Sequence, residues 1–330
     1  MTIEEKIRRR LDNLTKPRGS LGRLEELAVA YGVARGTADL RLERKAIFVF
    51  CADHGVAAEG VSAYPREVTR QMVRNFVSGG AAINVLCRQY GIDAFIVDAG
   101  VDGDPEPGVI GRRVARGTRN FLHEPAMTAE QAAQAVAVGR EMAARGGYDI
   151  VGTGEMGIGN TTAAAAVVSA LTGRDAAEVV GRGTGIDDAR WRHKVDVVRR
   201  ALARHAPAAT DPLGVLSAVG GFEIAAIAGL VLGAWERRVA VVVDGFIATA
   251  GALLAARLEP GTRAAMLFAH RSAEAGHGVA LEALEASPLL DLGMRLGEGT
   301  GAALAIGLIE SAVRLYREMA TFDSAGVTSA

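Results

Sequence analysis

Five short apolar runs along the chain predict buried β-strands. Each run has the length of a strand and is rich in apolar or β-branched residues, without the alternation of polar and apolar positions typical of a half-exposed strand. The runs cover residues 46–51, 94–97, 148–151, 239–243 and 264–268. Because strands that are covered on both faces are typical of parallel sheets, the pattern predicts such a sheet at the centre of the protein.

Helical stretches follow most of these runs. They cover residues 67–90, 128–145, 161–171 and 247–258. The alternation of strands and helices predicts an α/β fold.

Polar or glycine residues follow each predicted strand. In chain order they are Asp53-His54-Gly55, Asp98-Ala99-Gly100, Gly152-Thr153-Gly154, Asp244-Gly245 and His270-Arg271-Ser272. In open α/β sheets, ligands bind beyond the carboxyl ends of the strands, so these segments are expected on the ligand-binding face.

The two ends of the chain show no strand pattern. Residues 3–14 and 21–31 predict amphipathic helices, separated by Lys16-Pro17-Arg18-Gly19-Ser20, and residues 302–316 predict a long apolar helix. We therefore expect an α/β domain of residues 41–290 and a small helical domain built from residues 1–40 and 291–330. The last residues, from about Ser324, are expected to form a frayed tail.

The composition narrows the possible function classes. The chain has 330 residues, of which 49% are hydrophobic, so it can bury a large core. Its net charge of −1 gives no support for nucleic acid or an anionic membrane as a partner, and its aromatic share of 5% argues against a base-stacking platform.

The location of the protein is inferred from three features. The apolar stretch of residues 213–235 resembles a membrane span, but Glu223 and the Gly220-Gly221 pair favour a buried helix. Cys51 and Cys87 lie in apolar runs without the spacing of metal ligands. The N-terminus is charged and lacks an apolar signal core. We therefore expect a cytoplasmic protein with reduced thiols and no membrane span.

Glu298 stands between two glycines, immediately before the apolar stretch of residues 302–316. A carboxylate at the start of a helix is usually a cap or a partner of the helix dipole. Here Gly297 and Gly299 remove side chains on both sides, so a ligand can approach the carboxylate closely. A base in an apolar, glycine-lined place is suited to proton abstraction, which makes Glu298 a candidate general base.

The segment Gly152-Thr-Gly-Glu-Met-Gly157 matches the dinucleotide-binding pattern G-x-G-x-x-G, which is a weak signal by itself. No second strand ending in an acidic residue follows about twenty residues later, as a dinucleotide fold requires. We therefore interpret the segment as a phosphate-binding loop before the helix of residues 163–171. A tight strand-to-helix turn is the structural alternative.

Other candidate residues have ordinary structural explanations. Lys194 follows a second glycine-rich segment, residues 181–188, so a phosphate contact competes with a solvent-exposed lysine. Asp187 and the adjacent Asp188 are suited to cap the following helix. Finally, the histidines His54, His270 and His277 share no ligand spacing, so we expect neither a metal nor a redox cofactor.

Five separated segments together resemble one protein family. They are residues 11–25 (LDNLTKPRGSLGRLE), 51–56 (CADHGV), 62–69 (SAYPREVT), 154–162 (GEMGIGNTT) and 296–303 (LGEGTGAA). The chain resembles nicotinate-nucleotide–dimethylbenzimidazole phosphoribosyltransferases, enzymes of cobalamin nucleotide-loop assembly, over nearly its whole length.

The resemblance implies a Rossmann-like domain with flanking helices, a small helical domain from both termini, and a homodimer with shared active sites. It implies that nicotinate mononucleotide and 5,6-dimethylbenzimidazole give α-ribazole 5′-phosphate and nicotinate. It also implies a set of site residues: Glu298 as general base, Glu155 as a second carboxylate, Gly157, Gly159, Asn160, Thr161, Lys194 and Ser272 near the nucleotide, and Gln71 and Tyr64 at the base pocket.

The chemistry of this reaction agrees with the residues. Nicotinate leaves from a cationic pyridinium, so it needs no proton from the enzyme, and one base for the attacking benzimidazole is enough. The field of Glu155 would stabilise positive charge at the anomeric carbon. Attack from the opposite face would invert that carbon. Three alternatives stay open: a transferase or nucleosidase for another base, an NAD-dependent oxidoreductase, and a non-catalytic sensor.

Overall fold

Six parallel strands form one sheet in the order β3-β2-β1-β4-β5-β6, which confirms the predicted α/β fold. The computed structural model describes residues 1–183 and 185–328. The strands are β1 (Lys45–Ala52), β2 (Asp93–Gly100), β3 (Ile110–Gly111), β4 (Ile150–Met156), β5 (Ala240–Val243) and β6 (Met266–Phe268). The sequence pattern missed β3, whose two residues are too few to form an apolar run.

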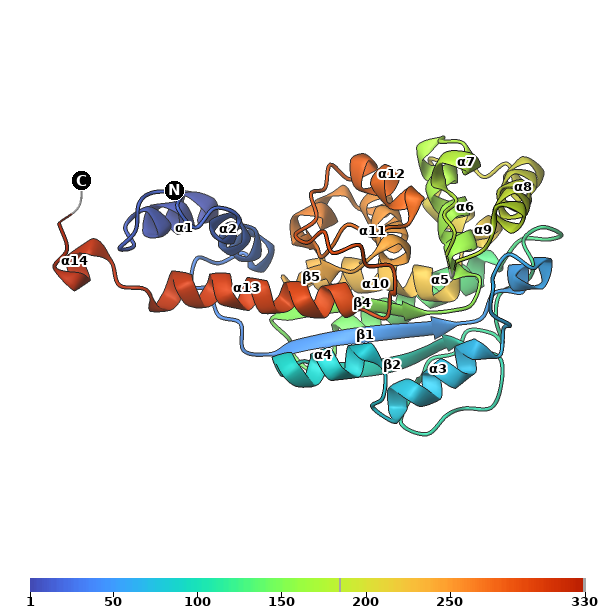
Figure 1. Cartoon of the computed structure of the whole chain (residues 1–330), viewed down its shortest axis with the longest axis horizontal. Coiled ribbons are helices and arrows are strands. Elements are labelled where there is room, and N and C mark those ends of the chain that lie inside the picture. Colours follow the sequence, from blue (N-terminus) through green and yellow to red (C-terminus); the bar gives the residue numbers. More distant parts are fainter. Residues whose placement is uncertain (184, 329–330) are drawn as a thin grey trace.

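Helices cover both faces of the sheet (Figure 1). The first face packs against α5 (Ala129–Ala143), α6 (Asn160–Thr172), α9 (Pro212–Val219), α10 (Phe222–Glu236), α11 (Phe246–Leu258) and α12 (Ala275–Ala283), with α7 (Ala176–Val179) and α8 (Asp188–His205) outside them. The second face packs against α2 (Arg23–Arg35), α3 (Val68–Val77), α4 (Ala82–Tyr90) and α13 (Thr300–Glu318). The 3-10 helices are η1 (Gly55–Glu59) and η2 (Pro260–Ala265).

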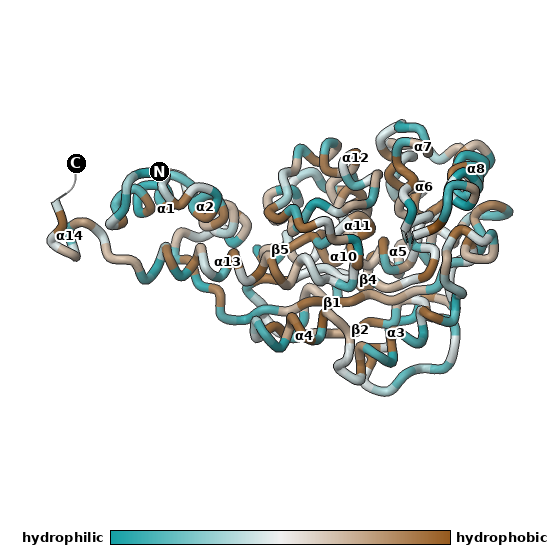
Figure 2. Tube along the Cα trace, viewed as in Figure 1, coloured by the Kyte–Doolittle hydropathy of each residue, from teal (hydrophilic) through white to brown (hydrophobic). Residues whose placement is uncertain are grey.

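Strand β1 explains why two hydrophobic cores exist. Phe48 and Phe50 belong to the core of the first face, whereas Ile47 and Val49 belong to the core of the second. All four side chains are fully buried. Alternate residues of a strand point to opposite faces, so a continuous apolar run supplies both cores. Figure 2 shows the same distribution, with apolar strands inside and hydrophilic positions gathered on the outer helix α8.

Two predicted helices are each divided in the structure. The stretch of residues 67–90 forms α3 and α4, because Gly79 adopts a positive φ of 77° and ends the first helix. The apolar stretch of residues 213–235 forms α9 and α10, separated by Gly220 and Gly221. No helix in the described part of the chain is both long and apolar enough to cross a membrane.

The two chain ends lie together at one end of the molecule (Figure 1). There α1 (Ile3–Asp12) and α2 pack near the second half of α13, and Leu14 forms a β-bridge with Thr321. The expected frayed tail is partly ordered, since α14 (Phe322–Ala325) is capped by Thr321. Residues 329 and 330 lie outside the described part. The helices α1 and α2 share a hydrophobic core with the sheet, so their apolar residues continue its second face.

Candidate active site

A cavity of about 670 Å³ opens at the carboxyl edge of the sheet. It lies where the strand order reverses between β1 and β4, the position at which doubly wound sheets bind ligands. Eight of the predicted site residues line it: Tyr64, Glu155, Gly157, Gly159, Asn160, Thr161, Ser272 and Glu298. The structure therefore brings together segments that are up to about 230 residues apart in the sequence.

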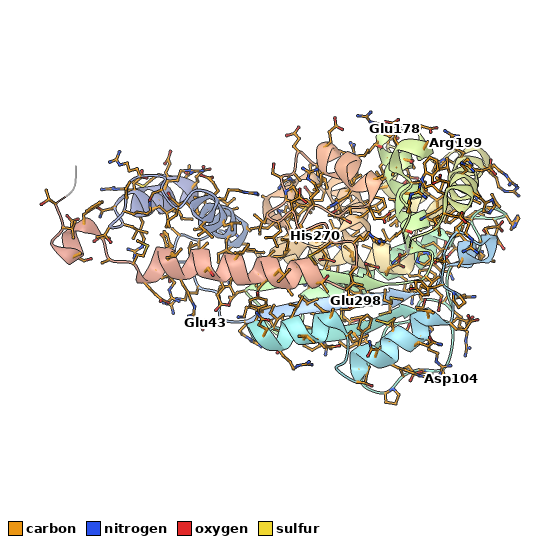
Figure 3. The ribbon with its side chains drawn as sticks, viewed as in Figure 1. Glu43, Asp104, Glu178, Arg199, His270 and Glu298 are labelled. Atoms are coloured by element: carbon orange, nitrogen blue, oxygen red, sulfur yellow. The ribbon has the colours of Figure 1, made fainter. Side chains whose placement is uncertain are left out.

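Glu298 is held immediately before α13, with a side chain that is nearly buried. Its backbone adopts a left-handed conformation with a φ of 64°, which costs a residue other than glycine of order 1–3 kcal/mol. Burial and the charge of Asp244 raise the pKa of the Glu298 carboxyl, while the backbone N–H of Ile83 favours the ionised form. Figure 3 shows Glu298 and His270 in the interior near the start of α13, unlike the peripheral Glu178 and Arg199.

The glycines of β4 bring Glu298 onto the sheet. Gly152 and Gly154 lie inside the strand, not in a loop, so this part of the predicted phosphate loop is corrected. A side-chain carbon at Gly154 would lie 2.6 Å from the carbonyl oxygen of Glu298, and one at Gly152 would lie 3.2 Å from Cβ of Ala302. Glycine is required at position 154 because the start of α13 packs directly on the β4 backbone, and at Gly152 a side-chain carbon would also meet Cγ1 of Ile47 at 2.7 Å.

Glu155 lies near the end of β4 and contacts the turn of residues 297–299 that holds Glu298. Its carboxylate accepts a hydrogen bond from the Asn160 amide and rests against Gly297, where a side-chain carbon would lie 2.1 Å from Oε1. Burial, with the charges of Asp244 and Glu223, raises the pKa of Glu155 to about 8. A pKa of about 8 keeps the Glu155 carboxyl mostly protonated at neutral pH, and a nearby cation would lower this pKa and favour the carboxylate.

The loop after β4 begins at Gly157 and leads into α6. A side-chain carbon at Gly157 would lie 2.3 Å from the carbonyl oxygen of Ala52, and Gly159 has a positive φ of 94°. No side chain caps α6, whose first residues Asn160 and Thr161 line the cavity, and the N–H of Asn160 donates to the carbonyl oxygen of Gly157. Such a helix N-terminus is suited to bind a phosphate.

Lys194 reaches the same place from α8. It is almost fully buried, and its Nζ donates a hydrogen bond of 2.8 Å to Oγ1 of Thr161. Burial lowers the pKa of Lys194 to about 8, although the charge of Glu274 acts in the opposite direction. Lys194 is therefore not a solvent-exposed helix residue. Asp187, in turn, caps α8 by accepting a hydrogen bond from the N–H of Arg190, as expected.

A chain of hydrogen bonds fixes the loop that carries Ser272. The N–H of Ser272 donates to Nδ1 of His277 at 2.8 Å, so the proton of this imidazole lies on Nε2. That nitrogen donates to Oγ1 of Thr249 at 3.0 Å, and the Thr249 hydroxyl donates to the carbonyl oxygen of Gly245. Because burial lowers the pKa of His277 to about 3, the imidazole stays neutral and the loop stays anchored to the end of β5.

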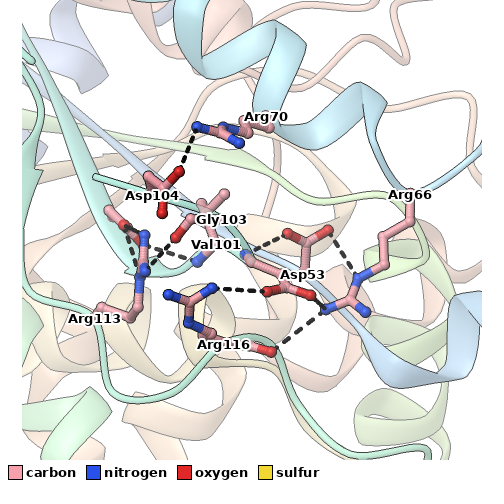
Figure 4. Close-up of polar contacts among 10 residues, drawn as sticks. Asp53, Arg66, Arg70, Val101, Gly103, Asp104, Arg113 and Arg116 are labelled. Atoms are coloured by element: carbon pink, nitrogen blue, oxygen red, sulfur yellow. Dashed lines mark hydrogen bonds and ion pairs between the residues drawn. The ribbon is translucent and has the colours of Figure 1, made fainter. Parts of the chain in front are cut away.

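Beside the cavity, salt bridges join the ends of β1 and β2 to the segment before α3 (Figure 4). Arg66 lies 3.4 Å from Asp53 and 3.3 Å from Asp102, whose N–H donates to Asp53 at 2.8 Å. Further along, Arg113 pairs with Asp98 at 2.7 Å. These contacts join the ends of β1 and β2 to the segment that carries Tyr64.

Gln71, which is expected at the base pocket, is not among the residues that line this cavity. It lines a neighbouring polar pocket of about 330 Å³ together with Asp53, Arg66, Glu67, Arg70, Arg74 and Asp102. Met72 and Val68 on α3 face the main cavity instead. The helix periodicity of α3 places Gln71 on the adjacent face.

The histidines that were considered as metal ligands, His54, His270 and His277, each contact different residues. Nε2 of His54 lies 2.8 Å from Glu223, and both side chains are fully buried beneath the cavity. His270 lines the cavity with its Nε2 3.9 Å from Asp244, and His277 anchors the loop described above. Within residues 1–183 and 185–328, no group of three or more His, Cys, Asp or Glu side chains could hold a metal ion.

The sequence interpretation missed Glu274 at this site and assigned no role to Asp244 or His270, which it expected only on the ligand-binding face. Glu274 lines the cavity, and its Oε2 is buried without a hydrogen-bond partner among the described residues. Asp244 and His270 were identified only as residues that follow strands. That position was itself the available signal.

The phosphoribosyltransferase family model DBI_PRT matches residues 1–327. Proteins named nicotinate-nucleotide–dimethylbenzimidazole phosphoribosyltransferase are similar over nearly the whole chain. The protein of that name from Geobacter metallireducens is 55% identical over 323 residues, covering 96% of this chain and 92% of the relative. This chain belongs to the nicotinate-nucleotide–dimethylbenzimidazole phosphoribosyltransferase family.

Other members of this phosphoribosyltransferase family agree. The protein of the same name from Chloroflexus aurantiacus is 54% identical over 326 residues, with coverage of 97% and 93%. The crystal structure of CobT from Thermus thermophilus matches with a TM-score of 0.95 and 49% identity, covering 99% of each chain. Family membership makes this chain an enzyme of the pentosyltransferase class, and it replaces the oxidoreductase alternative, which rested on glycines that the structure places inside β4.

Proposed function

We propose that this enzyme transfers the 5-phosphoribosyl group of nicotinate mononucleotide to 5,6-dimethylbenzimidazole, giving α-ribazole 5′-phosphate and nicotinate. The observation that carries the proposal is the buried Glu298, held between glycines at a cavity where the strand order reverses. The names of the similar proteins supply the two substrates.

The proposed reaction is a displacement at the anomeric carbon. A ring nitrogen of the benzimidazole forms a bond to C1′, and the bond from C1′ to the pyridinium nitrogen breaks, returning its electron pair to nicotinate. The benzimidazole then carries a positive charge, and its remaining N–H proton passes to the Glu298 carboxylate. Attack on the face opposite the leaving group inverts the anomeric carbon from β to α.

The proposed roles of the other residues follow from charge. The 5′-phosphate binds at the start of α6 near Lys194, which supplies a cation from a buried position. The cationic pyridinium lowers the pKa of Glu155, so this carboxyl ionises when substrate binds and stabilises positive charge at the reacting carbon. Ser272 and Tyr64 contact the nucleotide and the base.

We further propose that the enzyme is a cytoplasmic homodimer with shared active sites, and that residues 1–40 and 291–330 act as a helical unit beside residues 41–290. The support is the projecting group of terminal helices in Figure 1, which extends beyond the sheet and offers a surface for a second copy. Closed two-fold dimers are the commonest oligomers. Sedimentation of dilute enzyme tests this: a monomer with full activity per chain would exclude shared sites.

The function is tested by incubating the protein with nicotinate mononucleotide and a panel of benzimidazoles and purines, and by identifying products by mass. We expect release of nicotinate and a phosphoribosylated benzimidazole whose anomeric proton coupling reports the α configuration. Preferential transfer to a purine would favour a transferase for another base, and release of free ribose 5-phosphate would favour a nucleosidase. Binding without turnover by the folded protein would indicate a sensor.

A further inference from the structure

Asp244, directly after β5, binds the start of α13 although the two are more than fifty residues apart in the sequence. Its Oδ2 accepts the N–H of Gly299 at 3.2 Å, and its Oδ1 accepts the N–H of Ala302 at 2.9 Å. The carboxyl is buried. One side chain therefore satisfies two of the backbone N–H groups that every helix leaves free at its N-terminus.

The helix α13 depends on this contact because it has no cap of its own. Its N-cap residue is Gly299, which has no side chain to accept a hydrogen bond. A side-chain carbon at Gly301 would lie 2.8 Å from Oδ1 of Asp244 and 2.1 Å from Cδ2 of His270, so glycine is required for the approach. Asp244 thus does for α13 what an N-cap residue ordinarily does, but from a neighbouring strand.

The contact extends directly to Glu298. The N–H of Gly299 belongs to the peptide group that joins it to Glu298, so Asp244 fixes the plane of that peptide. Glu298 and its two neighbours all have positive φ values, of 81°, 64° and 90° in chain order. Such a turn persists only when its surroundings hold it.

We propose that Asp244 is a positioning residue of the enzyme, which holds the Gly297–Gly299 turn so that the Glu298 carboxylate stays directed at the cavity. The proposal rests on the proposed function, in which Glu298 is the base. It assigns to Asp244 no contact with substrate.

Asp244 also acts on Glu298 through its charge. The groups that face Glu298 are Asp244 after β5, Glu155 in β4, His270 after β6 and the N–H of Ile83 in α4. The charge of Asp244 raises the pKa of both Glu298 and Glu155. Burial raises the pKa of Asp244 itself to about 6, so its charge acts on Glu298 above that pH, and removing this charge lowers the pKa of Glu298.

A second contact offers a graded perturbation. The N–H of Asp244 donates to Oγ1 of Thr153 at 3.0 Å, from the adjacent strand β4. The substitution Thr153→Val removes this hydrogen bond but leaves the carboxylate and its charge in place. It therefore loosens Asp244 without neutralising it.

The experiment measures kcat, KM and the pH profile of kcat/KM for the wild type, Asp244→Asn and Thr153→Val. We expect Asp244→Asn to lower kcat by about 10- to 100-fold, with KM for both substrates changed less than about threefold, and to move the acid limb of the profile to lower pH. Thr153→Val should lower kcat by a smaller factor and leave the acid limb in place.

The matched control is Asp149→Asn. Asp149 also accepts two backbone N–H groups, those of Glu43 and Arg44, but it lies at the opposite edge of the sheet. It should lower Tm while leaving kcat and the acid limb unchanged. Wild-type kcat with an unmoved acid limb in Asp244→Asn would overturn the proposal, as would a profile equal to that of Asp149→Asn.

A measurement without turnover separates this proposal from the proposed function. The pKa of the Glu298 carboxyl is obtained by ¹³C NMR titration, assigned with Glu298→Gln, in the wild type, Asp244→Asn and Thr153→Val. A lower pKa in Asp244→Asn supports the charge coupling even if the wild type does not react with nicotinate mononucleotide. An unchanged pKa in an active enzyme would overturn the coupling and leave the proposed function standing.

Discussion

Charged residues at the amino ends of the strands (the amino edge of the sheet) are paired with opposite charges, whereas several buried carboxylates at the carboxyl ends (the carboxyl edge) are not. At the amino edge, the carboxylate of Asp149 accepts two backbone N–H groups and pairs with Arg35 at 2.9 Å. Nearby, Lys45 donates to Glu310 and to the carbonyl oxygen of Tyr90, each at 2.6 Å. Each of these charges is compensated by a neighbour of opposite sign.

At the carboxyl edge, buried carboxylates are left short of partners. The Oε2 atoms of Glu298 and Glu274 have no hydrogen-bond partner within the described parts of the chain. Three carboxyls here, those of Glu155, Asp244 and Glu298, have pKa values raised by burial. Buried carboxyls without full compensation are typical of functional sites, where a ligand can supply the remaining partners.

The largest effect on turnover is expected from Glu298→Gln, which keeps the shape of the side chain and removes the proposed base. We expect kcat to fall by roughly 10²- to 10⁴-fold, the usual contribution of a general base. Steady-state turnover of a variant with wild-type circular dichroism measures it. Near-normal turnover would mean that another group accepts the proton.

A smaller effect is expected from Gly159→Ala, at the start of α6. Its positive φ of 94° strains any other residue, so the N–H groups of the loop lose their alignment with the phosphate. We expect KM for the nucleotide to rise by about tenfold, with less change for the benzimidazole. The riboside that lacks the 5′-phosphate should be a poor substrate of the wild type, and equal reaction of riboside and nucleotide would contradict phosphate binding here.

The pH dependence of KM for the nucleotide distinguishes the titration of Lys194 from that of the carboxyls at this edge. Lys194 is charged below its pKa of about 8 and neutral above it, so nucleotide affinity should decline as pH rises through 8. Lys194→Arg keeps the charge at all these pH values, and its KM for the nucleotide should stay flat between pH 7 and 9. An identical rise in KM with pH in both proteins would assign the titration to another group.

The smallest effect is expected at the amino edge. Asp149→Asn removes a charge that is bonded to Arg35 and to two backbone N–H groups, so we expect a loss of about 1–2 kcal/mol in the free energy of unfolding. Denaturant titration measures the loss, and kcat should remain that of the wild type. A large fall in kcat at native stability would show that the two edges are coupled.

The sequence predicted the sheet because its strands are apolar on both faces. It also predicted most of the cavity, since the polar residues after β1, β4, β5 and β6 share one edge. The breaks between α3 and α4 and between α9 and α10 depend on glycine pairs that a periodic pattern passes over.

Contacts between distant segments could not be predicted from local patterns. The glycines of β4 suggested a phosphate loop, but their reason is the close packing of α13, which only the assembled fold reveals. Likewise, the role of Asp244 depends on Gly299 and Ala302, far along the chain. Gln71 lines a neighbouring pocket, and its place at the base pocket stays a prediction, because one position along a helix changes which pocket a side chain meets.

The helix α13 has a consequence for how the chain is completed during synthesis. It begins directly after the turn that holds Glu298, packs against α2 and α4, and is followed by the bridge from Thr321 back to Leu14. A ribosome releases α1 and α2 long before α13, so these helices expose apolar faces until the final segment emerges. A nascent chain that stops before residue 298 therefore lacks both the proposed base Glu298 and the helix that closes the second core, so we expect incomplete chains to be inactive and open to proteolysis.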